Sequence, residues 1–217
     1  MKYRVFIVMV VLVICCAGIH ASAWDITGLT KEWAGDATMR PYDIATLSNG
    51  SIWMTHESAG NGSLITLDYP TGTFMRYNAS FSAHFHTLDA ATDDTLWIAD
   101  YSGSLVHFSP YALSFESYPI PALFPADPRP YGVNAAADGR VWFTCQSDPP
   151  CIGMYDPSAD SWERYDLPEG ADYPPGVPVE IDFESDGTVW FTIKKIDSGG
   201  ANGGLGRIDP DSGDTTI

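Results

Sequence analysis

A tryptophan motif recurs four times along this chain at nearly constant spacing. Trp53, Trp97, Trp142 and Trp190 follow one another at intervals of 44, 45 and 48 residues. Each lies shortly after an Asp or Asn turn signal and about a dozen residues after the start of an extended run. Self-similarity at a period of 40 to 50 residues is typical of repeat architectures, among them the β-propeller. The chain is therefore predicted to fold from four copies of one structural unit.

Each unit divides into four short runs that are typical of strands. In the third repeat these are residues 130–136, 140–145, 151–156 and 162–167, which are rich in β-branched and aromatic residues and separated by turn pairs such as Asp138-Gly139. Matching third strands are predicted at 63–68, 104–109 and 205–209, and fourth strands at 74–79 and 115–120, with the last cut short at 214–217. Four antiparallel strands without helices form one propeller blade. The predicted fold is an all-β propeller.

The number of repeats indicates part of a ring. A six- or seven-bladed ring at about 45 residues per blade needs roughly 270 to 315 residues, and this chain has 217. The segment Leu29–Trp33 resembles an outer fourth strand that arrives before any complete repeat. Residues 24–217 are therefore interpreted as a sector of a larger propeller, from a truncated reading frame, with the tryptophans between the blades.

The first 23 residues form a separate segment. Lys2 and Arg4 precede an apolar run from Val5 to Gly18, and Ala21-Ser22-Ala23 has the small-residue pattern of a cleavage site. This is the pattern of a secretory signal peptide, and the apolar run is too short for a membrane span of about 20 residues. We expect cleavage after Ala23, a secreted or extracytoplasmic protein, and no membrane span in the mature chain.

Charge excludes one class of partner. The chain has 28 Asp and Glu against 11 Lys and Arg, a formal net charge of −17. Such a surface repels nucleic acid and anionic membranes. The acids are scattered through predicted turns, so most are expected to be solvated loop ends.

After signal cleavage two cysteines remain, Cys145 and Cys151. They flank a short hairpin loop of residues 146–150 in a chain that is predicted to be exported. Two cysteines in that position are predicted to form a disulfide bond.

Candidate site residues lie at fixed offsets from the tryptophans. The first strand of each blade lines the central funnel of a propeller. Eleven residues before each tryptophan the chain has Tyr42, His86, Tyr131 and Val179, and three residues after it His56, Asp100, Cys145 and Ile193. The first two repeats thus bring together Tyr42, His56, His86 and Asp100, with Glu57 and His84 close in sequence. A histidine beside a carboxylate is the minimum for general-base chemistry or for binding a hard metal ion.

The repeat resembles virginiamycin B lyase, the streptogramin lyase family. The resemblance covers residues 29–217. It rests on Pro-Tyr-Gly-Val at 130–133, Asp-Gly-Arg-Val-Trp-Phe-Thr at 138–144, Glu-Arg-Tyr-Asp-Leu-Pro at 163–168 and Leu-Gly-Arg-Ile-Asp-Pro at 205–210.

The resemblance implies a seven-bladed propeller that opens the ester of a cyclic depsipeptide by a magnesium-dependent elimination. His86 occupies the place of the family's basic histidine, and Asp100 that of its metal-binding acid. Tyr42 and Tyr131 match its cleft tyrosine. His56 stands where the family has its acid, and its place at the funnel makes it a further predicted substrate contact. Phe85 stands where the family has proline, and His84 where it has an acid.

Three functions stay open on the sequence. The first is a non-catalytic propeller that binds a small-molecule or peptide ligand in its funnel. The second is a lyase that uses Mg2+ to break a C–O bond in a cyclic depsipeptide or lactone. The third is a hydrolase similar to gluconolactonase, for which Asn134 and Asp182 are isolated candidate ligands.

Overall fold

The computed structural model describes residues 38–57, 60–168, 176–195 and 203–217. Within these ranges the chain forms sixteen strands and no helix. No helix in the described part is long and apolar enough to cross a membrane. The predicted signal peptide and the predicted strand Leu29–Trp33 lie outside the described residues.

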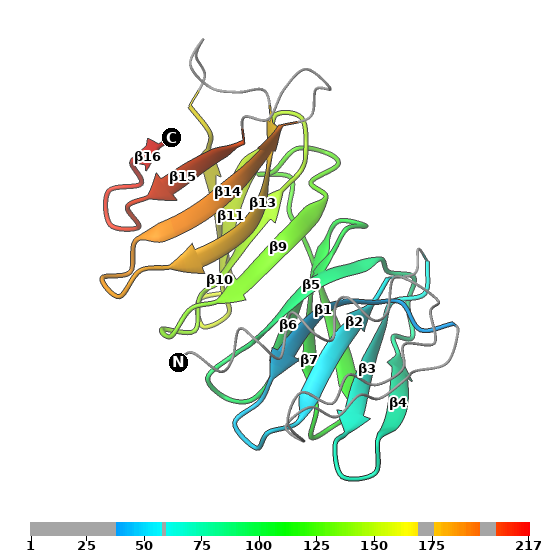
Figure 1. The fold of residues 1–217 in the computed structure, drawn as a ribbon. Helices are drawn as coiled ribbons and strands as arrows, with labels where there is room; N and C mark the ends of the chain where they lie inside the picture. The colour runs from blue at the N-terminus through cyan, green and yellow to red at the C-terminus, as the bar shows by residue number, and fades with distance from the viewer. Residues whose placement is uncertain (1–37, 58–59, 169–175, 196–202) are drawn as a thin grey trace.

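The strands form four antiparallel sheets of four strands each, in sequence order (Figure 1). The first blade consists of β1 (Pro41–Thr46), β2 (Ile52–His56), β3 (Ser63–Asp68) and β4 (Thr73–Asn78). The second consists of β5 (Phe85–Ala90), β6 (Leu96–Asp100), β7 (Ser104–Ser109) and β8 (Ser114–Pro119). The third consists of β9 (Pro130–Ala135), β10 (Val141–Cys145), β11 (Cys151–Asp156) and β12 (Ser161–Asp166). The fourth consists of β13 (Gly176–Phe183), β14 (Val189–Lys195), β15 (Gly204–Ile208) and β16 (Thr215–Thr216).

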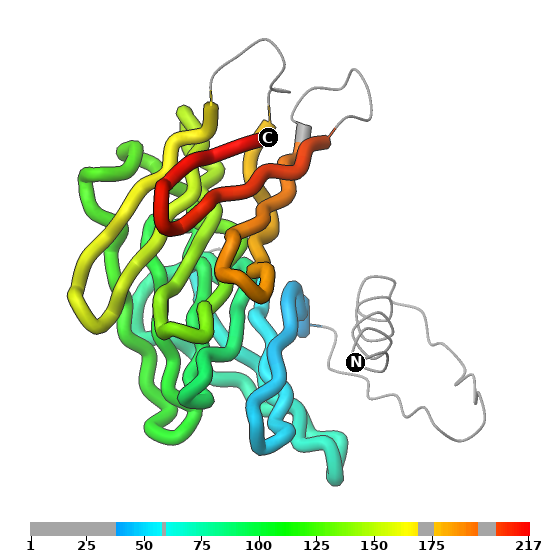
Figure 2. The backbone as a smooth tube through the Cα atoms, turned by 90° about the vertical axis from the view of Figure 1, so that its left-hand side faces the viewer, coloured from blue at the N-terminus to red at the C-terminus, as the bar shows by residue number. Residues whose placement is uncertain are grey.

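The blades follow one another around an axis that is lined by their first strands. β1 contacts β5, β5 contacts β9, and β9 contacts β13, and the chain passes from blade to blade in order from blue to red (Figure 2). This arrangement confirms the predicted propeller sector of four blades. The first three outer strands begin one residue earlier than expected. The last is short, as predicted, but it covers only Thr215–Thr216 of the predicted 214–217.

The turn between the first two strands of each blade has the same hydrogen-bond pattern. Asn49, Asp93, Asp138 and Asp186 each accept a hydrogen bond at Oδ1 from the backbone N–H two residues later. Gly50, Gly139 and Gly187 have φ values of +83°, +91° and +92°, and Asp94 takes this left-handed role in the second blade with φ +62°. The Asx-turn chemistry of these residues sets the turns. These acids therefore have a structural role, as predicted for solvated loop ends.

Three apolar clusters hold neighbouring blades together. Trp53, Trp97 and Trp142 are 5%, 5% and 1% exposed, and each packs in the cluster between its own blade and the next. Burying a large aromatic side chain removes 150–250 Å2 from water and dominates such an interface. Trp190 is only half-buried, because in the described part of the chain no further blade covers its face of the fourth sheet. The predicted place of the tryptophans between blades is confirmed for the first three.

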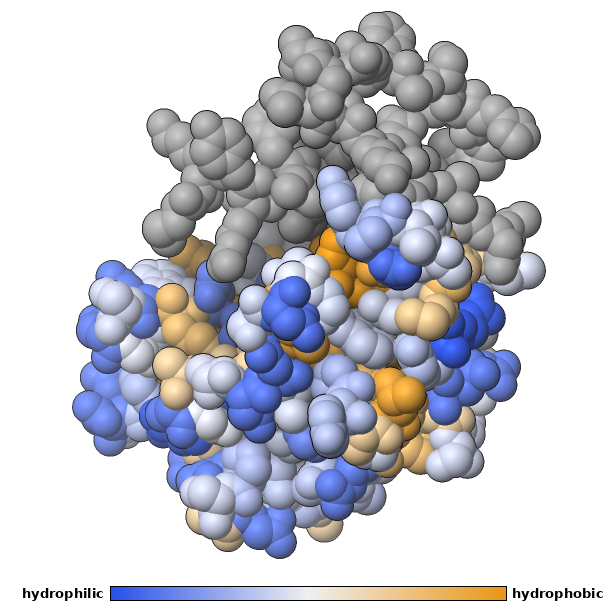
Figure 3. Space-filling model, turned by 90° about the horizontal axis from the view of Figure 1, so that it is seen from below, coloured by the Kyte–Doolittle hydropathy of each residue, from blue (hydrophilic) through white to orange (hydrophobic). Residues whose placement is uncertain are grey.

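One face of the molecule can be described by its hydropathy. The face seen from below is mostly hydrophilic, with separate apolar patches between the polar side chains (Figure 3). Such isolated patches are ordinary on soluble proteins.

Candidate functional site

The inner strand of every blade carries a bulge at the same place. Pro41 pairs with His56, but the next paired residues are Ile44 and Met54, so Tyr42 and Asp43 together lie opposite Thr55. The same shift places three further residue pairs opposite one residue of the second strand: His86–Thr87, Tyr131–Gly132 and Val179–Glu180. A β-bulge bends its strand and re-aims the side chains at the extra residue. The positions predicted to face the funnel are the first residues of these bulges.

Threonine hydroxyls fill the bulges and connect successive blades. Thr144 Oγ1 accepts the N–H of Gly132 at 2.8 Å and donates to the carbonyl of Val179 in the next blade at 2.9 Å. In the first blade, Thr55 Oγ1 accepts the N–H of Asp43 and donates to the carbonyl of His86 in the next blade. The second blade has Ala99 at this position, and Thr87 on the inner strand bridges to the third blade instead.

These bulges bring three rings together from three successive blades. The ring centroid of His86 lies 5.0 Å from that of Tyr42 and 4.6 Å from that of Tyr131. The hydroxyls of Tyr42 and Tyr131 are in hydrogen-bond contact, although 89 residues separate them in sequence. The structure therefore joins three of the predicted site residues, and it places His86 between the two tyrosines.

Two further rings complete this group. The ring centroids of His84 and Tyr101 lie 4.7 Å and 4.9 Å from that of His86. The ring centroids of Tyr101 and Tyr131 are 6.4 Å apart. We call Tyr42, His84, His86, Tyr101 and Tyr131 the funnel cluster. Tyr101 was missed by sequence reasoning. Its position in the repeat, four residues after Trp97, could have indicated it. The residue at this position in the first blade is Glu57, which also lies close enough to influence the pKa of Tyr42 and of His86.

His86 is held in its neutral form. Burial lowers its pKa to about 4, with a further contribution from the nearby His84, while Glu57 partly offsets both. The side chain is 8% exposed, and its Nδ1 is buried without a partner. No hydrogen bond in the described ranges reaches its Nε2 either. At neutral pH the cluster thus contains an imidazole with a free acceptor nitrogen.

The inner strands also carry three buried carboxyl groups. Burial raises the pKa of Asp43, Asp89 and Glu180. The carboxylates of Asp43 and Asp89 accept backbone N–H groups of the following blade, Leu88 and Ala135 respectively. These hydrogen bonds connect the inner strands of neighbouring blades, so the two aspartates help to hold the blades together.

Asp100, the predicted metal ligand, accepts two backbone hydrogen bonds. It is 2% exposed, and its Oδ1 accepts the N–H of His84 at 2.7 Å and that of Ser102 at 3.0 Å. Its register partner is Phe85, the residue before the bulge. The carboxylate therefore fixes the backbone that carries His84. Its predicted role as a metal ligand stays a prediction.

His56 lies apart from the funnel cluster. It pairs with Pro41, again before the bulge, and its Nε2 lies 3.0 Å from the carbonyl oxygen of Thr38. No ring contact links it to Tyr42 or His86 in the described part of the chain. Its side chain lines a separate cavity in the first blade.

The described residues do not fit a magnesium site. Mg2+ requires near-octahedral coordination by oxygen atoms. Among the described residues, no group of three His, Cys, Asp or Glu side chains converges on one point. Asn134 and Asp182 have other partners. The Asn134 amide donates to the carbonyl of Ile181 in the next blade, and Asp182 Oδ1 accepts the N–H of the following residue, Phe183. The magnesium ion stays a prediction that these residues alone do not support.

Cys145 and Cys151 face each other directly across β10 and β11. Both are buried, and the structure records them as free thiols, so the predicted bond is not formed in it. Burial raises the pKa of the Cys145 thiol. Directly opposed residues have Cα atoms about 4.5–5.5 Å apart, which is within the range that a disulfide spans. The pairing of the two strands therefore allows the predicted bond, which stays a prediction.

Secreted protein is expected to begin at Trp24 and to carry a Cys145–Cys151 bond, because an oxidising compartment converts opposed thiols to disulfides. Intact mass under non-reducing and reducing conditions measures both features. A start at Met1, or alkylation of two thiols without prior reduction, would contradict this expectation.

The funnel cluster has the groups that a small-molecule binding site uses. It presents aromatic faces and tyrosine hydroxyls around one neutral imidazole acceptor. Aromatic walls with a few fixed polar groups are typical of small-molecule sites. The same imidazole could accept a proton from a ligand that is held against it.

The virginiamycin B lyase family model matches residues 29–216. No curated protein sequence matches the chain significantly.

Solved structures agree in fold. A catalytically inactive variant of virginiamycin B lyase from Staphylococcus aureus with quinupristin is similar, with a TM-score of 0.66 and 24% identity over 86% of this chain. The chain spans 58% of the length of that enzyme. The extracellular domain of a one-component system from B. thetaiotaomicron aligns at TM-score 0.62 and 16% identity, over 82% of this chain and 22% of that one. A protein described as a gluconolactonase aligns with a TM-score of 0.57 and 15% identity, over 79% of this chain and 60% of that one.

Proposed function

The chain belongs to the virginiamycin B lyase family, and we propose that it binds a small-molecule or peptide ligand in its central funnel. The observation that supports this most is His86, a neutral imidazole between Tyr42 and Tyr131 whose ring nitrogens have no partner in the described part of the chain. A polar group this deeply buried is normally hydrogen-bonded. A ligand that donates an N–H or O–H to His86 would remove that deficit.

The surrounding rings narrow the ligand class. The ring centroids of Tyr42, Tyr101 and Tyr131 all lie within 5.0 Å of the His86 ring centroid. The rings of Tyr101 and Tyr131 also contact each other. Aromatic faces suit apolar or aromatic side chains, and a neutral acceptor suits an amide N–H or a hydroxyl. A cyclic peptide or depsipeptide offers both. Quinupristin, the molecule with the similar Staphylococcus aureus enzyme, is therefore the first ligand to test.

We expect quinupristin to bind the exported protein, and His86→Ala to weaken binding about tenfold or more. A lost hydrogen bond to a buried acceptor costs about 1–3 kcal/mol, which corresponds to roughly a five- to hundredfold change in Kd. Isothermal titration calorimetry measures the affinity of each variant. Tyr42→Phe removes one hydroxyl from the cluster and is expected to have a smaller effect in the same direction.

Tyr111→Phe is the matched control for Tyr42→Phe, because Tyr111 is fully exposed at 101% and lies outside the funnel cluster. It should leave the affinity unchanged. Binding that is equally strong in wild type and His86→Ala would refute the proposal, as would an absence of binding by the wild type.

The same titration has a defined pH dependence. The pKa of His86 is lowered to about 4 by burial, so the acceptor nitrogen stays free from pH 8 down to about pH 5. Affinity is expected to be flat over that range and to fall as the pH approaches 4. A fall centred near pH 6.5, the ordinary value for histidine, would contradict the lowered pKa of His86.

A second candidate is the lyase activity of the family. The unprotonated His86 supports it, because a base must be free to take a proton at neutral pH. In an elimination His86 takes a proton from carbon, the C–H electrons form a C=C bond, and the ester C–O bond breaks with its electron pair leaving on the carboxylate. The ring-opened product keeps the mass of the substrate, whereas hydrolysis adds one water. Mass spectrometry of quinupristin after incubation distinguishes elimination, hydrolysis and binding without turnover.

A further inference from the structure

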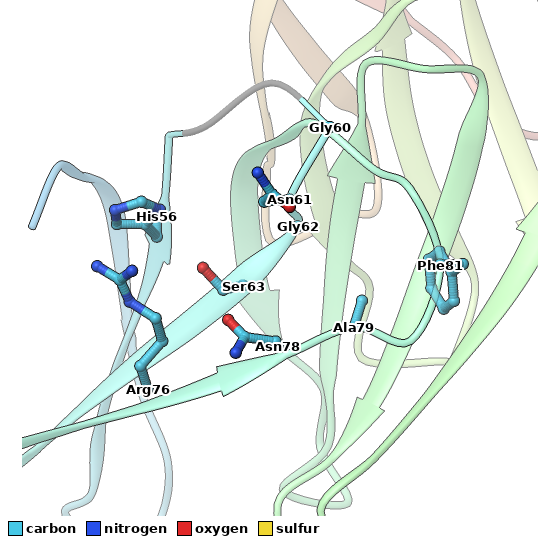
Figure 4. A pocket seen from close by; sticks show the side chains of 9 residues that line it. All are labelled: His56, Gly60, Asn61, Gly62, Ser63, Arg76, Asn78, Ala79 and Phe81. Atoms are coloured by element: carbon cyan, nitrogen blue, oxygen red, sulfur yellow. The ribbon is translucent and has the colours of Figure 1, made fainter. Parts of the chain in front are cut away.

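The first blade contains a polar cavity that is separate from the funnel cluster. It has a volume of about 320 Å3 and is lined by His56, Gly60, Asn61, Gly62, Ser63, Arg76, Asn78, Ala79 and Phe81 (Figure 4). We call these nine residues the first-blade pocket. A volume near 300 Å3 lies at the lower end of the range for small-molecule sites.

Strand register explains how its polar groups converge. His56 on β2 pairs with Ser63 on β3, and Ser63 pairs with Asn78 on β4, so these three residues form one row across the sheet. The corresponding row in the third blade is Cys145, Cys151 and Asp166, and its two thiols are buried in the core against the second blade. The first blade has polar side chains where the third blade has apolar packing. The same row in the second blade consists of Asp100, Ser104 and Pro119, so polar residues occur at this place in two blades.

One ring nitrogen of His56, a residue that lines this pocket, has no hydrogen-bond partner in the described part of the chain. Its Nε2 faces the carbonyl oxygen of Thr38 at 3.0 Å, and a carbonyl can only accept, so Nε2 carries the proton. In the neutral ring Nδ1 then has a lone pair. The side chain is 5% exposed, and Nδ1 is buried without a donor. A ligand hydroxyl at Nδ1 would satisfy it.

Arg76 adds an unpaired positive charge. The guanidinium groups of Arg129, Arg140 and Arg164 each form an ion pair with an aspartate, but Arg76 forms none in the part of the chain that the structure describes. None of the nine lining residues is acidic, although the whole chain has a net charge of −17. In Figure 4 the Arg76 side chain lies beside His56 and Ser63. A carboxylate is the group that an arginine fork binds best, through two parallel hydrogen bonds.

From these contacts we infer that the first-blade pocket binds a hydroxylated carboxylic acid of monosaccharide size, such as an acidic sugar. The carboxylate pairs with Arg76, and a hydroxyl donates to Nδ1 of His56. The amides of Asn61 and Asn78 and the hydroxyl of Ser63 bond the other hydroxyls of the ligand, and Phe81 forms an apolar wall. This inference is independent of the proposed function, since no residue of the funnel cluster lines the pocket.

The test uses D-glucuronate as probe and follows binding by ligand-observed NMR and calorimetry. Glucuronate is expected to bind at least about tenfold more tightly than D-glucose and than acetate, because it alone presents both the charge and the hydroxyls. Arg76→Gln should weaken glucuronate binding about tenfold or more, which is the loss expected for a charge-assisted hydrogen bond. Arg207→Gln, a change to an exposed arginine on β15 outside the pocket, should leave it unchanged.

Each other outcome overturns the inference. No detectable glucuronate binding, or equal losses in Arg76→Gln and Arg207→Gln, would show that the pocket is not the site. Acetate binding as tight as glucuronate binding would show that only charge is recognised. Glucose binding as tight as glucuronate binding would remove the role of Arg76.

Discussion

Gly132→Ala is expected to destabilise the protein by about 2 kcal/mol or more. A Cβ at this position would lie 2.1 Å from the carbonyl oxygen of Val179 in the next blade. That oxygen cannot move aside freely, because it accepts the hydroxyl of Thr144 at 2.9 Å. Overpacking at a backbone contact of this kind typically costs about 1–3 kcal/mol, occasionally more. Denaturant unfolding followed by tryptophan fluorescence measures the change.

Gly204→Ala is the matched control. A Cβ there would meet the Cδ1 atom of Ile193 at 3.3 Å, which is the movable end of a side chain. The expected change is within about 0.5 kcal/mol, as for an ordinary surface substitution. If the two variants were equally stable, the third and fourth blades would not be in the close contact that the structure shows.

The same substitution also connects the fold to the site. Gly132 follows Tyr131 in the bulge of β9, and the Tyr131 ring is 4.6 Å from that of His86. Separating β9 from β13 would therefore move one wall of the funnel cluster. A Gly132→Ala variant that still folds is expected to bind quinupristin more weakly than wild type, if the proposed function is correct.

Much of the fold could be predicted because it rests on local chemistry that repeats. The Asn-Gly and Asp-Gly turns, such as Asp138-Gly139, use Asx hydrogen bonds and positive φ values that few other residues provide. A tryptophan follows each turn at a fixed distance, so blade boundaries can be read from sequence. The outer strands were predicted one residue late because their pairing extends to the turn residue, as between Asp68 and Thr73.

The candidate site was predicted only in part, and the reason is the bulge. Counting eleven residues back from each tryptophan found Tyr42, His86 and Tyr131, because the bulge lies at the same place in every inner strand. Counting three residues forward found His56 and Asp100. These residues pair with the residue before the bulge, and their side chains have other partners.

The register shift at the bulge decides which side chains face the funnel, and it has no clear sequence signature. Alternation along a strand predicts which residues share a face only while pairing stays regular. One extra residue on β5 directs His86 toward the neighbouring blades, while Asp100 remains level with Phe85. Tyr101, the next residue, is the one that reaches His86. In the second blade, the residue four after the tryptophan therefore joins the cluster.

Thr144→Val is expected to destabilise the protein by about 2 kcal/mol or more, although valine has nearly the same shape. Thr144 is fully buried, and its hydroxyl satisfies both the N–H of Gly132 and the carbonyl of Val179. Valine would leave these two backbone groups without a partner away from water, and each such group costs about 1–3 kcal/mol. The loss is measured by urea unfolding at neutral pH.

Thr192→Val separates the contribution within a blade from that between blades. Thr192 occupies the same position in the fourth blade and accepts the N–H of Glu180 at 3.1 Å, but it is exposed. Its hydroxyl donates to no carbonyl of another blade in the described part of the chain. Water can replace a hydrogen bond at an exposed site, so the expected change is within about 0.5 kcal/mol. Equal losses in Thr144→Val and Thr192→Val would mean that the threonine stabilises only its own bulge, and that the bond to the next blade contributes nothing to stability.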